Sequence, residues 1–503
     1  MNTSKYDIII GLEIHIQSKT NTKMFCSCST NYFEKEPNTH VCPTCLGLPG
    51  ALPVPNRRAI ELCILLGLAT NCDIDSEIHF DRKHYFYPDL PKGYQISQYK
   101  RAICSDGYID IKDEDGKKYT IEIERIHQEE DVAKSTHHKQ GDSEYSLIDY
   151  NKSGVPLIEI VSKPNIKSAY QAREYASSIR QLVRYLNISD GDMEKGQMRC
   201  EPNISVQEKG KWEYRDGKIL PLGDYKLNPK SEVKNIGSIS AVEKSILYEV
   251  ERMVKELEEG KELIQQTRGW NADKGITEFQ RSKETADDYR YMPEPDIPII
   301  EIKDEDIERI SKEIVELPSE KKERYISSYS LSDYDSTVLT ADKNISTYFE
   351  DLLSLLSKSM DTVKAAKAAS NWITGTVFSI ANDRKIEVNE KNIPKASLAY
   401  LILEFEKKVL TKNKAESLLK ESIEQKKDLK ELVQISLSES KQNTDNLDSI
   451  VDEVINNNPK AVNDYKSGKQ STIGFLVGQV MQKTKGSADP NKAKDILIQK
   501  LNG

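Results

Sequence analysis

The sequence lacks any long hydrophobic run. Its best apolar segments, residues 8–10 and 62–69, fall far short of the roughly 18 apolar residues that a membrane-spanning helix needs. The residues after Met1 also lack the apolar core and small-residue cleavage site of an export signal. We therefore expect a soluble, cytoplasmic protein that has no membrane partner.

Cysteine is also sparse, with eight Cys in 503 residues. This number excludes a disulfide-dense scaffold, and in a reducing compartment such thiols are more often free or metal-bound than paired. Hydrophobic residues make up 37% and charged residues 30%, with a net charge of −9. A chain of this length is expected to form about three domains. The composition indicates a heavily solvated globular protein.

The residue types change along the chain. All seven His lie before residue 140, and no Cys lies after Cys200. Up to residue 298, β-type runs dominate and three helical patterns interrupt them. The predicted strands include residues 7–17, 120–126, 146–149 and 156–161, and the predicted helices are residues 59–69, 169–186 and 238–257.

Helical patterns dominate after the proline-rich turn at residues 293–298. They include residues 305–317 and 345–358, and an amphipathic helix at 416–430. We predict three parts, residues 1–298, 299–405 and 406–503. The last part ends in a block, residues 460–503, with eight Lys against three Asp. This mild positive charge suits contact with phosphates, and a solvated helix face explains it about as well.

Four cysteines fall into two close pairs. Cys26 and Cys28 are followed, after thirteen residues, by Cys42 and Cys45. Two pairs on separate turns supply two edges of a tetrahedral four-thiolate zinc site, which is structural because it has no open position. Independently packed thiols seldom show this spacing. The sequence therefore predicts a zinc knuckle at residues 26–45.

A second set of polar residues lies in or beside predicted strands. Glu13 and His15 share one face of their strand, because alternate residues point to the same side. Glu159 lies in an apolar run, where a carboxylate is costly to bury unless it is paired or bound to a metal. Residues 129–131 are three consecutive acids after another strand. Carboxylates and an imidazole suit Mg²⁺ and nucleotide phosphates, but an exposed strand face also explains the pattern.

Aromatic and basic residues alternate in residues 80–94. Such a segment can stack on a nucleotide or on an RNA end. A proline-broken loop held by its own Tyr and Phe rings explains the composition equally well.

Motifs along almost the whole chain resemble one family, the B subunit of the tRNA-dependent Asp/Glu amidotransferase. The matching segments are residues 10–15, 52–54, 80–83, 85–88, 94–98, 129–131, 156–160, 199–205, 232–235, 288–291, 293–295 and 474–481. The resemblance implies an α+β fold with a β-rich, cradle-shaped catalytic domain, an all-α helical domain and a small helical tail domain that binds tRNA. Residues 201–202, 235–238 and 277–281 depart from the common family pattern.

The resemblance also implies an activity, that of a glutamine-hydrolysing carbon–nitrogen ligase. ATP would phosphorylate the side-chain carboxylate of mischarged Glu-tRNA(Gln) or Asp-tRNA(Asn), and ammonia would then displace the phosphate. The ammonia would come from a glutaminase A subunit, with a small C subunit completing a heterotrimer, and DNA would have no part. The cysteine quartet matches the zinc-bearing branch of the family.

Individual roles follow from the same resemblance. The implied magnesium ligands, which are also catalytic residues, are Glu13, His15, Glu130 and Glu159. Lys83 would lie near the ATP phosphates or the end of the ammonia path, and the nucleotide's further neighbours would be Arg199, Glu201 and Asn203.

Two alternatives to this function differ from it in the role of the chain. One is a tRNA-binding scaffold without catalysis of its own, which the carboxylates and the His in predicted strands argue against. The other is the archaeal Glu-tRNA-specific relative, which carries a large insertion for which residues 291–303 leave no room.

Overall fold

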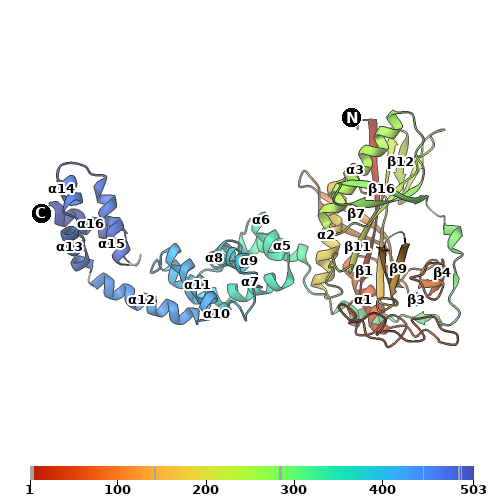
Figure 1. The fold of residues 1–503 in the computed structure, drawn as a ribbon, viewed down its shortest axis with the longest axis horizontal. Coiled ribbons are helices and arrows are strands. Elements are labelled where there is room, and N and C mark those ends of the chain that lie inside the picture. The colour runs from red at the N-terminus through yellow and green to blue at the C-terminus, as the bar shows by residue number, and fades with distance from the viewer. Residues whose placement is uncertain are drawn as a thin grey trace. The chain divides into compact units, whose positions relative to one another are not determined.

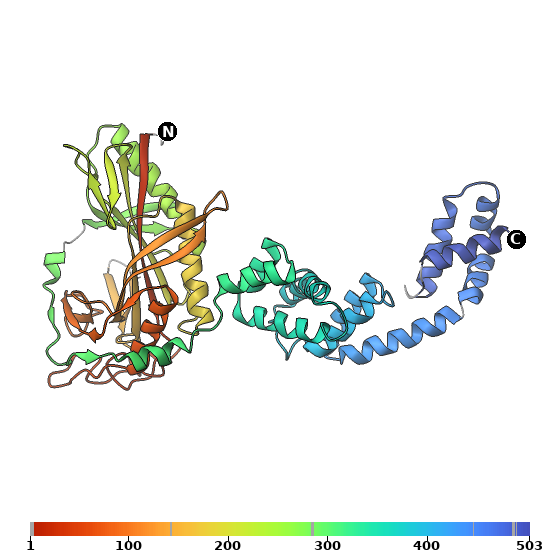
Figure 2. The same ribbon diagram turned by 180° about the vertical axis from the view of Figure 1, so that it is seen from behind.

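The computed structural model describes residues 5–140, 143–282, 286–445, 447–484, 488 and 490–502. The chain divides into two compact units, Met1–Leu317 and Pro318–Gly503. The first unit is built on β-sheets with helices beside them, and the described residues of the second form helices and connecting turns (Figures 1 and 2). The predicted α+β class is confirmed.

A nine-stranded sheet forms the centre of the first unit within the described residues, in the order β16-β15-β14-β11-β1-β10-β7-β6-β2. Its central strands are antiparallel neighbours. They are β1 (Tyr6–Gln17), β7 (Lys118–Glu130), β10 (Pro156–Ser162) and β11 (Met198–Glu208). The register places His15 opposite Glu159, and Glu159 opposite His127. Directly opposed residues share a face, so the three side chains project to the same side.

Shorter strands complete the sheets. The outer strands of the large sheet are β2 (Asp73–Ile74), β6 (Cys104–Lys112), β14 (Ser231–Lys234), β15 (Gln266–Asn271) and β16 (Ile276–Ser282). The small sheets pair β17 (Met292–Pro293) with β4 (Asp81–His84) and β4 with β5 (Tyr94–Ser97), β18 (Ile300–Glu301) with β3 (Glu77–Ile78), β8 (Lys134–Gln140) with β9 (Ser143–Asp149), and β12 (Trp212–Arg215) with β13 (Lys218–Pro221).

Three helices pack against the large sheet, α1 (Arg57–Ala69), α2 (Ala169–Tyr185) and α3 (Ile239–Glu258). The even-numbered residues of β1, from Ile10 to Ile16, are buried in one core with the apolar faces of these helices. Because side chains alternate along a strand, the odd-numbered residues Glu13 and His15 project from the opposite face. The predicted helices and strands of this unit up to residue 298 are confirmed, with ends that shift by a few residues, whereas the helix predicted at residues 305–317 ends at Ser311.

The second unit contains two separate hydrophobic clusters, one within residues 325–433 and one within 447–501. Its elements are α5 (Pro318–Tyr329), α6 (Asp333–Thr340), α7 (Lys343–Leu356), α8 (Thr362–Asn371), the π-helical turn η3 (Trp372–Val377), α9 (Phe378–Arg384), α10 (Lys395–Glu406), α11 (Lys412–Gln425), α12 (Leu429–Asp445), α13 (Leu447–Asn457), α14 (Pro459–Lys466), α15 (Thr472–Lys483) and α16 (Pro490–Asn502). None of the helices in the described part of the chain is both long and apolar enough to cross a membrane.

The single helix predicted at residues 416–430 is wrong, because the segment is divided between α11 and α12. Lys426 adopts a left-handed conformation, with φ of 52°, and ends α11. Two residues later the Asp428 carboxylate accepts a hydrogen bond of 2.7 Å from the amide of Lys430, which is how an N-cap side chain starts a new helix. The leucine periodicity continues across the break between α11 and α12, and only the capping residue Asp428 marks that break in the sequence.

Residues 299–317 pack with the first unit, which therefore extends beyond the predicted boundary at residue 298. Strand β18 pairs with β3, and α4 (Asp304–Ser311) lies beside α1. Arg58 on α1 forms an ion pair of 2.8 Å with Glu313, just after α4. The further division at residue 405 stays a prediction.

Candidate functional site

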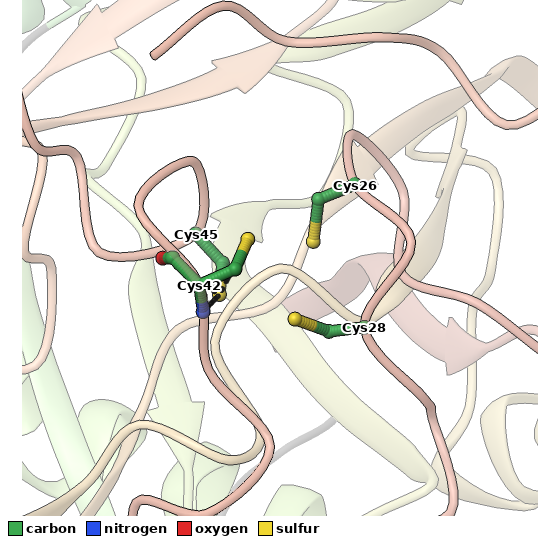
Figure 3. Close-up of side chains that lie close together, drawn as sticks. All are labelled: Cys26, Cys28, Cys42 and Cys45. Carbon is green, nitrogen blue, oxygen red and sulfur yellow. Dashed lines mark hydrogen bonds between the residues drawn. The ribbon is translucent and has the colours of Figure 1, made fainter.

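The four predicted zinc ligands, the cysteine quartet Cys26, Cys28, Cys42 and Cys45, meet in the structure. Their sulfurs all lie within 4.8 Å of one another, and they reach a common point from two loops (Figure 3). The Cys42 and Cys45 sulfurs are 3.9 Å apart. Tetrahedral Zn–S bonds of about 2.3 Å place sulfurs about 3.8 Å apart. The geometry therefore fits a zinc ion held by all four thiolates.

A buried lysine supports this assignment. Lys23 is fully buried, and its ammonium donates hydrogen bonds to the Cys45 sulfur at 3.6 Å and to the backbone oxygens of His40 and Tyr150. Among the described residues no carboxylate lies within ion-pair distance of it. A buried charge is costly without a counter-charge, and the Cys45 thiolate supplies one.

The thiol titrations point the same way. The hydrogen bond from the Cys26 thiol, aided by the Cys42 amide and Lys23, lowers the pKa of Cys45 to about 4. The same hydrogen bond to Cys45, together with burial, raises the pKa of Cys26 far above its ordinary value. Without a metal the quartet therefore keeps a proton on Cys26, and a bound cation is needed to hold all four as thiolates.

A second group with metal-ligand chemistry lies on the large sheet. His15 Nε2 is 3.7 Å from Glu129 Oε1 and 3.5 Å from Glu159 Oε2, and their ligand atoms lie within 4.8 Å of one another. We call these three residues the carboxylate–histidine group. His127 lies behind it, with Nε2 3.3 Å from Glu159 Oε2. The pairing of β1 with β10 and of β10 with β7 brings these side chains together.

Burial and the charges of neighbouring side chains shift the pKa values in this group. Burial, and the repulsion of Glu159, raise the pKa of Glu129. Burial opposes the charge of Glu159, but His127 and His15 outweigh it and lower the pKa of this carboxyl well below its usual range. Burial likewise lowers the pKa of His15, while Glu159, Glu201 and Glu129 together raise it to about 9. The two carboxylates and, once its proton is lost, the His15 imidazole fit a divalent cation such as Mg²⁺.

Glu130, a predicted magnesium ligand, is not brought to this group. Its carboxylate accepts a hydrogen bond of 3.0 Å from the Ile96 amide and forms a buried ion pair with Lys92. Adjacent residues of β7 point to opposite faces of the sheet, so Glu129 lies with His15 and Glu130 does not. Counting alternate residues along the sequence could not select Glu129, because only the pairing of β7 with β10 fixes which face meets His15.

A second acidic group lies beside the first. Ligand atoms of Glu13, Glu201 and Glu232 lie within 4.8 Å of one another. Asn203 Nδ2 donates to Glu13 Oε1 at 2.9 Å, and Lys234 Nζ lies 3.0 Å from Glu201 Oε2. The predicted site residues Glu13, Glu201 and Asn203 are thus neighbours.

Both acidic groups line one cavity of about 410 Å³. The predicted site residues on its wall are Glu13, His15, Lys83, Glu159, Arg199 and Glu201. The other residues on the wall, none of which was among the predicted site residues, are Tyr85, Gln95, Tyr99, Arg125, Glu129, Asp131, Val132, Leu157, Glu232, Lys234, Arg281, Tyr289 and Tyr291. Arg199 donates to the buried Asp131 carboxylate at 3.0 Å. The motifs at residues 232–235 and 288–291 signalled part of this set without giving a chemical role.

The alternating segment at residues 80–94 contributes to the same wall. Lys83, on β4, and Tyr85, just after it, face the cavity, whereas Phe86 is 75% exposed. The segment is therefore part of the cavity as well as a loop held by its rings.

Comparisons with known proteins agree with the fold and with the family that the motifs resemble. Residues 8–308 match a family model described as the GatB/GatE catalytic domain, and residues 354–501 match one described as the GatB domain. A protein of Thermoanaerobacter pseudethanolicus, named as the B subunit of an aspartyl/glutamyl-tRNA(Asn/Gln) amidotransferase, is 43% identical over 99% of this chain and 100% of its own. Proteins of the same name from Thermodesulfovibrio yellowstonii and a Thermotoga species are 41% and 42% identical, each over 99% of this chain and 99–100% of their own.

Proposed function

The chain belongs to the GatB family of tRNA-dependent amidotransferase B subunits, and we propose that its cavity is where a mischarged aminoacyl-tRNA is activated by ATP. As a family member it is a subunit of an amidotransferase complex. The proposal concerns the chemistry that this chain performs within that complex.

The observation that carries the proposal is the convergence of the carboxylate–histidine group and Lys83 in one cavity. A side-chain carboxylate is a poor electrophile. When its oxygen attacks the γ-phosphorus of ATP, ADP leaves and an acyl phosphate forms. Ammonia then attacks the acyl carbon, phosphate leaves with the electrons of the broken C–O bond, and the amide remains.

The residues of the cavity have distinct parts in this scheme. His15, Glu129 and Glu159 would hold Mg²⁺, which when bound would offset the charge of the transferring phosphoryl group. Lys83 supplies a second positive charge near the phosphates. Glu13, with Glu201 and Asn203, lines the neighbouring wall, and Arg199, fixed by Asp131, borders the nucleotide.

Other parts of the molecule support the catalytic cavity. The cysteine quartet would hold a structural zinc ion. Residues 406–503, with their basic end, bind the body of the tRNA. A glutaminase A subunit delivers ammonia and a small C subunit completes the heterotrimer. The complex works in the cytoplasm, where aminoacyl-tRNA is used.

The test is ADP release by the chain co-purified with its partner subunits, with Glu-tRNA(Gln) and Asp-tRNA(Asn) supplied separately. Release that requires one of them supports the proposal and names the substrate. Adjacent variants compare the two acids of β7: we expect Glu129→Gln to lower kcat at least a hundredfold and Glu130→Gln to retain most of it at equal folded protein.

Two outcomes would contradict the proposal. Tight tRNA binding without ADP release would leave the chain a scaffold. Loss of activity in Glu130→Gln with full activity in Glu129→Gln would remove the carboxylate–histidine group from the chemistry.

A further inference from the structure

A short segment after β16 supplies two tyrosines to the cavity. Tyr289 and Tyr291 lie on the cavity wall, and the chain then pairs with β4 through Met292, opposite Arg82. We call residues 289–296 the tyrosine strap. Since β4 also carries Lys83, the strap and the lysine are held in adjacent strands.

A buried ion pair attaches the strap to β4. Arg82 Nε and Nη2 donate to the two carboxylate oxygens of Glu294, each at 2.8 Å, and the Glu294 side chain is fully buried. Arg82 Nη2 also reaches Asp296 at 3.0 Å, and its guanidinium lies 4.2 Å from the ring centroid of Tyr94. A bidentate pair of this kind fixes direction as well as distance. The strap therefore has a defined position over the cavity.

The Lys83 ammonium is placed by rings and not by a direct ion pair. Its nitrogen lies 4.8 Å from the ring centroid of Tyr289 and 5.9 Å from that of Tyr85. Among the described residues no carboxylate lies within 4.0 Å of it. The face of an aromatic ring attracts a cation at these distances, and more strongly where water is excluded.

The Tyr289 ring is itself held by its neighbours. Its centroid lies 6.1 Å from that of Tyr85, with the planes at 80°, and 6.2 Å from that of Tyr291, at 64°. Such edge-to-face packing is favourable for aromatic pairs. The ring therefore presents its face to Lys83 from a fixed place.

We propose that Tyr289 is a positioning residue, whose ring face holds the Lys83 ammonium beside the carboxylate–histidine group, and that the Arg82–Glu294 pair keeps this ring in place. For its effect on catalysis the inference rests on the proposed function, while the placement of Lys83 is measurable without ATP or RNA. The ring face, and not the tyrosine hydroxyl, is what the inference requires.

The first experiment measures the acylation rate of Lys83 by an amine-reactive acetylating reagent at fixed pH, read by mass spectrometry on the intact complex. Only the free amine reacts, so a ring that stabilises the ammonium slows the reaction. We expect Tyr289→Leu to raise the rate about fivefold and Tyr289→Phe to change it less than twofold. Tyr108→Leu, on β6, is the matched control for losing a tyrosine elsewhere. A Tyr289→Phe variant that behaves like Tyr289→Leu would overturn the inference.

A second series of variants tests the same ring without requiring that the protein fold with leucine at position 289. Phenylalanine carrying zero, one, two or three ring fluorines is incorporated at position 289, which weakens the negative ring face with little change of shape. We expect the acylation rate of Lys83 to rise with each fluorine, and kcat for ADP release to fall by up to about tenfold across the series. An acylation rate of Lys83 that stays constant across the fluorinated variants would overturn the inference even if ADP release were normal.

A third comparison tests the attachment of the strap. Glu294→Gln should raise acylation of Lys83 in the wild-type background and add nothing in the Tyr289→Leu background, since both act through the same ring. Full additivity would show that Glu294 acts by another route and would overturn that part. Absence of ADP release in the wild-type complex, with the acylation pattern as expected, would instead count against the proposed function alone.

Discussion

The cysteine quartet and the carboxylate–histidine group both bring metal-ligand side chains together, but the residues of the two sites are separated by very different lengths of sequence. The quartet lies within residues 26–45 on two loops. The other group takes one residue from each of three strands, at positions 15, 129 and 159. A local site depends on the loops that carry it. A site built across strands depends on register, where a slip of one residue would turn every side chain to the other face.

The two sites also differ in how they balance charge. The quartet has a buried lysine, Lys23, beside the Cys45 thiolate. In the carboxylate–histidine group, the like charge of Glu159, together with burial, raises the cost of ionising Glu129. The first arrangement favours lasting stability with a bound ion. The second leaves the carboxylates of Glu129 and Glu159 on the cavity wall, where a cation can reach them.

The largest effect is expected from removing a zinc ligand. Cys28→Ser should reduce bound zinc, measured by plasma emission spectroscopy, from about one ion per chain to none. The melting temperature should fall by several degrees, because the binding free energy of a structural zinc contributes to folding. Cys63→Ser, a buried thiol outside the quartet, should keep the zinc. Full zinc content in Cys28→Ser would contradict the four-thiolate site.

Substitution of the two carboxylates of the carboxylate–histidine group should change activity and stability in different ways. Glu129→Gln and Glu159→Gln should each lower ADP release at least a hundredfold, about 3 kcal/mol in activation free energy. Their stabilities should differ: Glu129→Gln relieves repulsion and keeps or raises the melting temperature, while Glu159→Gln leaves His15 and His127 without their anion and lowers it. Thermal unfolding monitored by fluorescence measures this. Equal destabilisation of both variants would contradict this charge balance.

Lys23 offers a smaller test on the zinc side. Lys23→Met removes the hydrogen bond to the Cys45 sulfur and should speed zinc loss to a chelator about tenfold, as for other outer-shell partners of metal ligands. Lys19→Met, next to the same loop but partly exposed, is the matched control and should keep the wild-type rate. Before the chelator is added, the two variants should release ADP at similar rates, since neither residue belongs to the carboxylate–histidine group. An unchanged rate of zinc loss in Lys23→Met would show that the buried ammonium does not help to retain zinc.

The smallest effect is expected away from both sites. Arg58→Ala removes ion pairs of 2.8 Å with Glu313 and 3.3 Å with Glu61, and the Arg58 side chain in both is 45% exposed. Exposed pairs contribute little, so the free energy of unfolding should change by no more than about 0.5 kcal/mol. Zinc content and ADP release should be unchanged. A larger loss in urea denaturation would show that residues 299–317 stabilise the first unit more than a surface pair can explain.

Sequence reasoning was most successful where the relevant contacts are local. The spacing of Cys26, Cys28, Cys42 and Cys45 was enough to point to one site, because a short loop limits where its thiols can go. Strand alternation placed Glu13 and His15 on one face. The helical periodicity of residues 416–430 did not show that Asp428 starts a new helix.

The sequence by itself determined that a β-rich part precedes a helical part, that the cysteine quartet forms one site and, through motifs along the chain, the family. Only the tertiary structure decided that Glu129 and not Glu130 joins His15 and Glu159, and that Tyr289 lies over Lys83. These facts depend on which strands pair and in what register. Pairing between distant strands is settled by the burial of the whole sheet against α1, α2 and α3, and no single segment of the sequence contains that information.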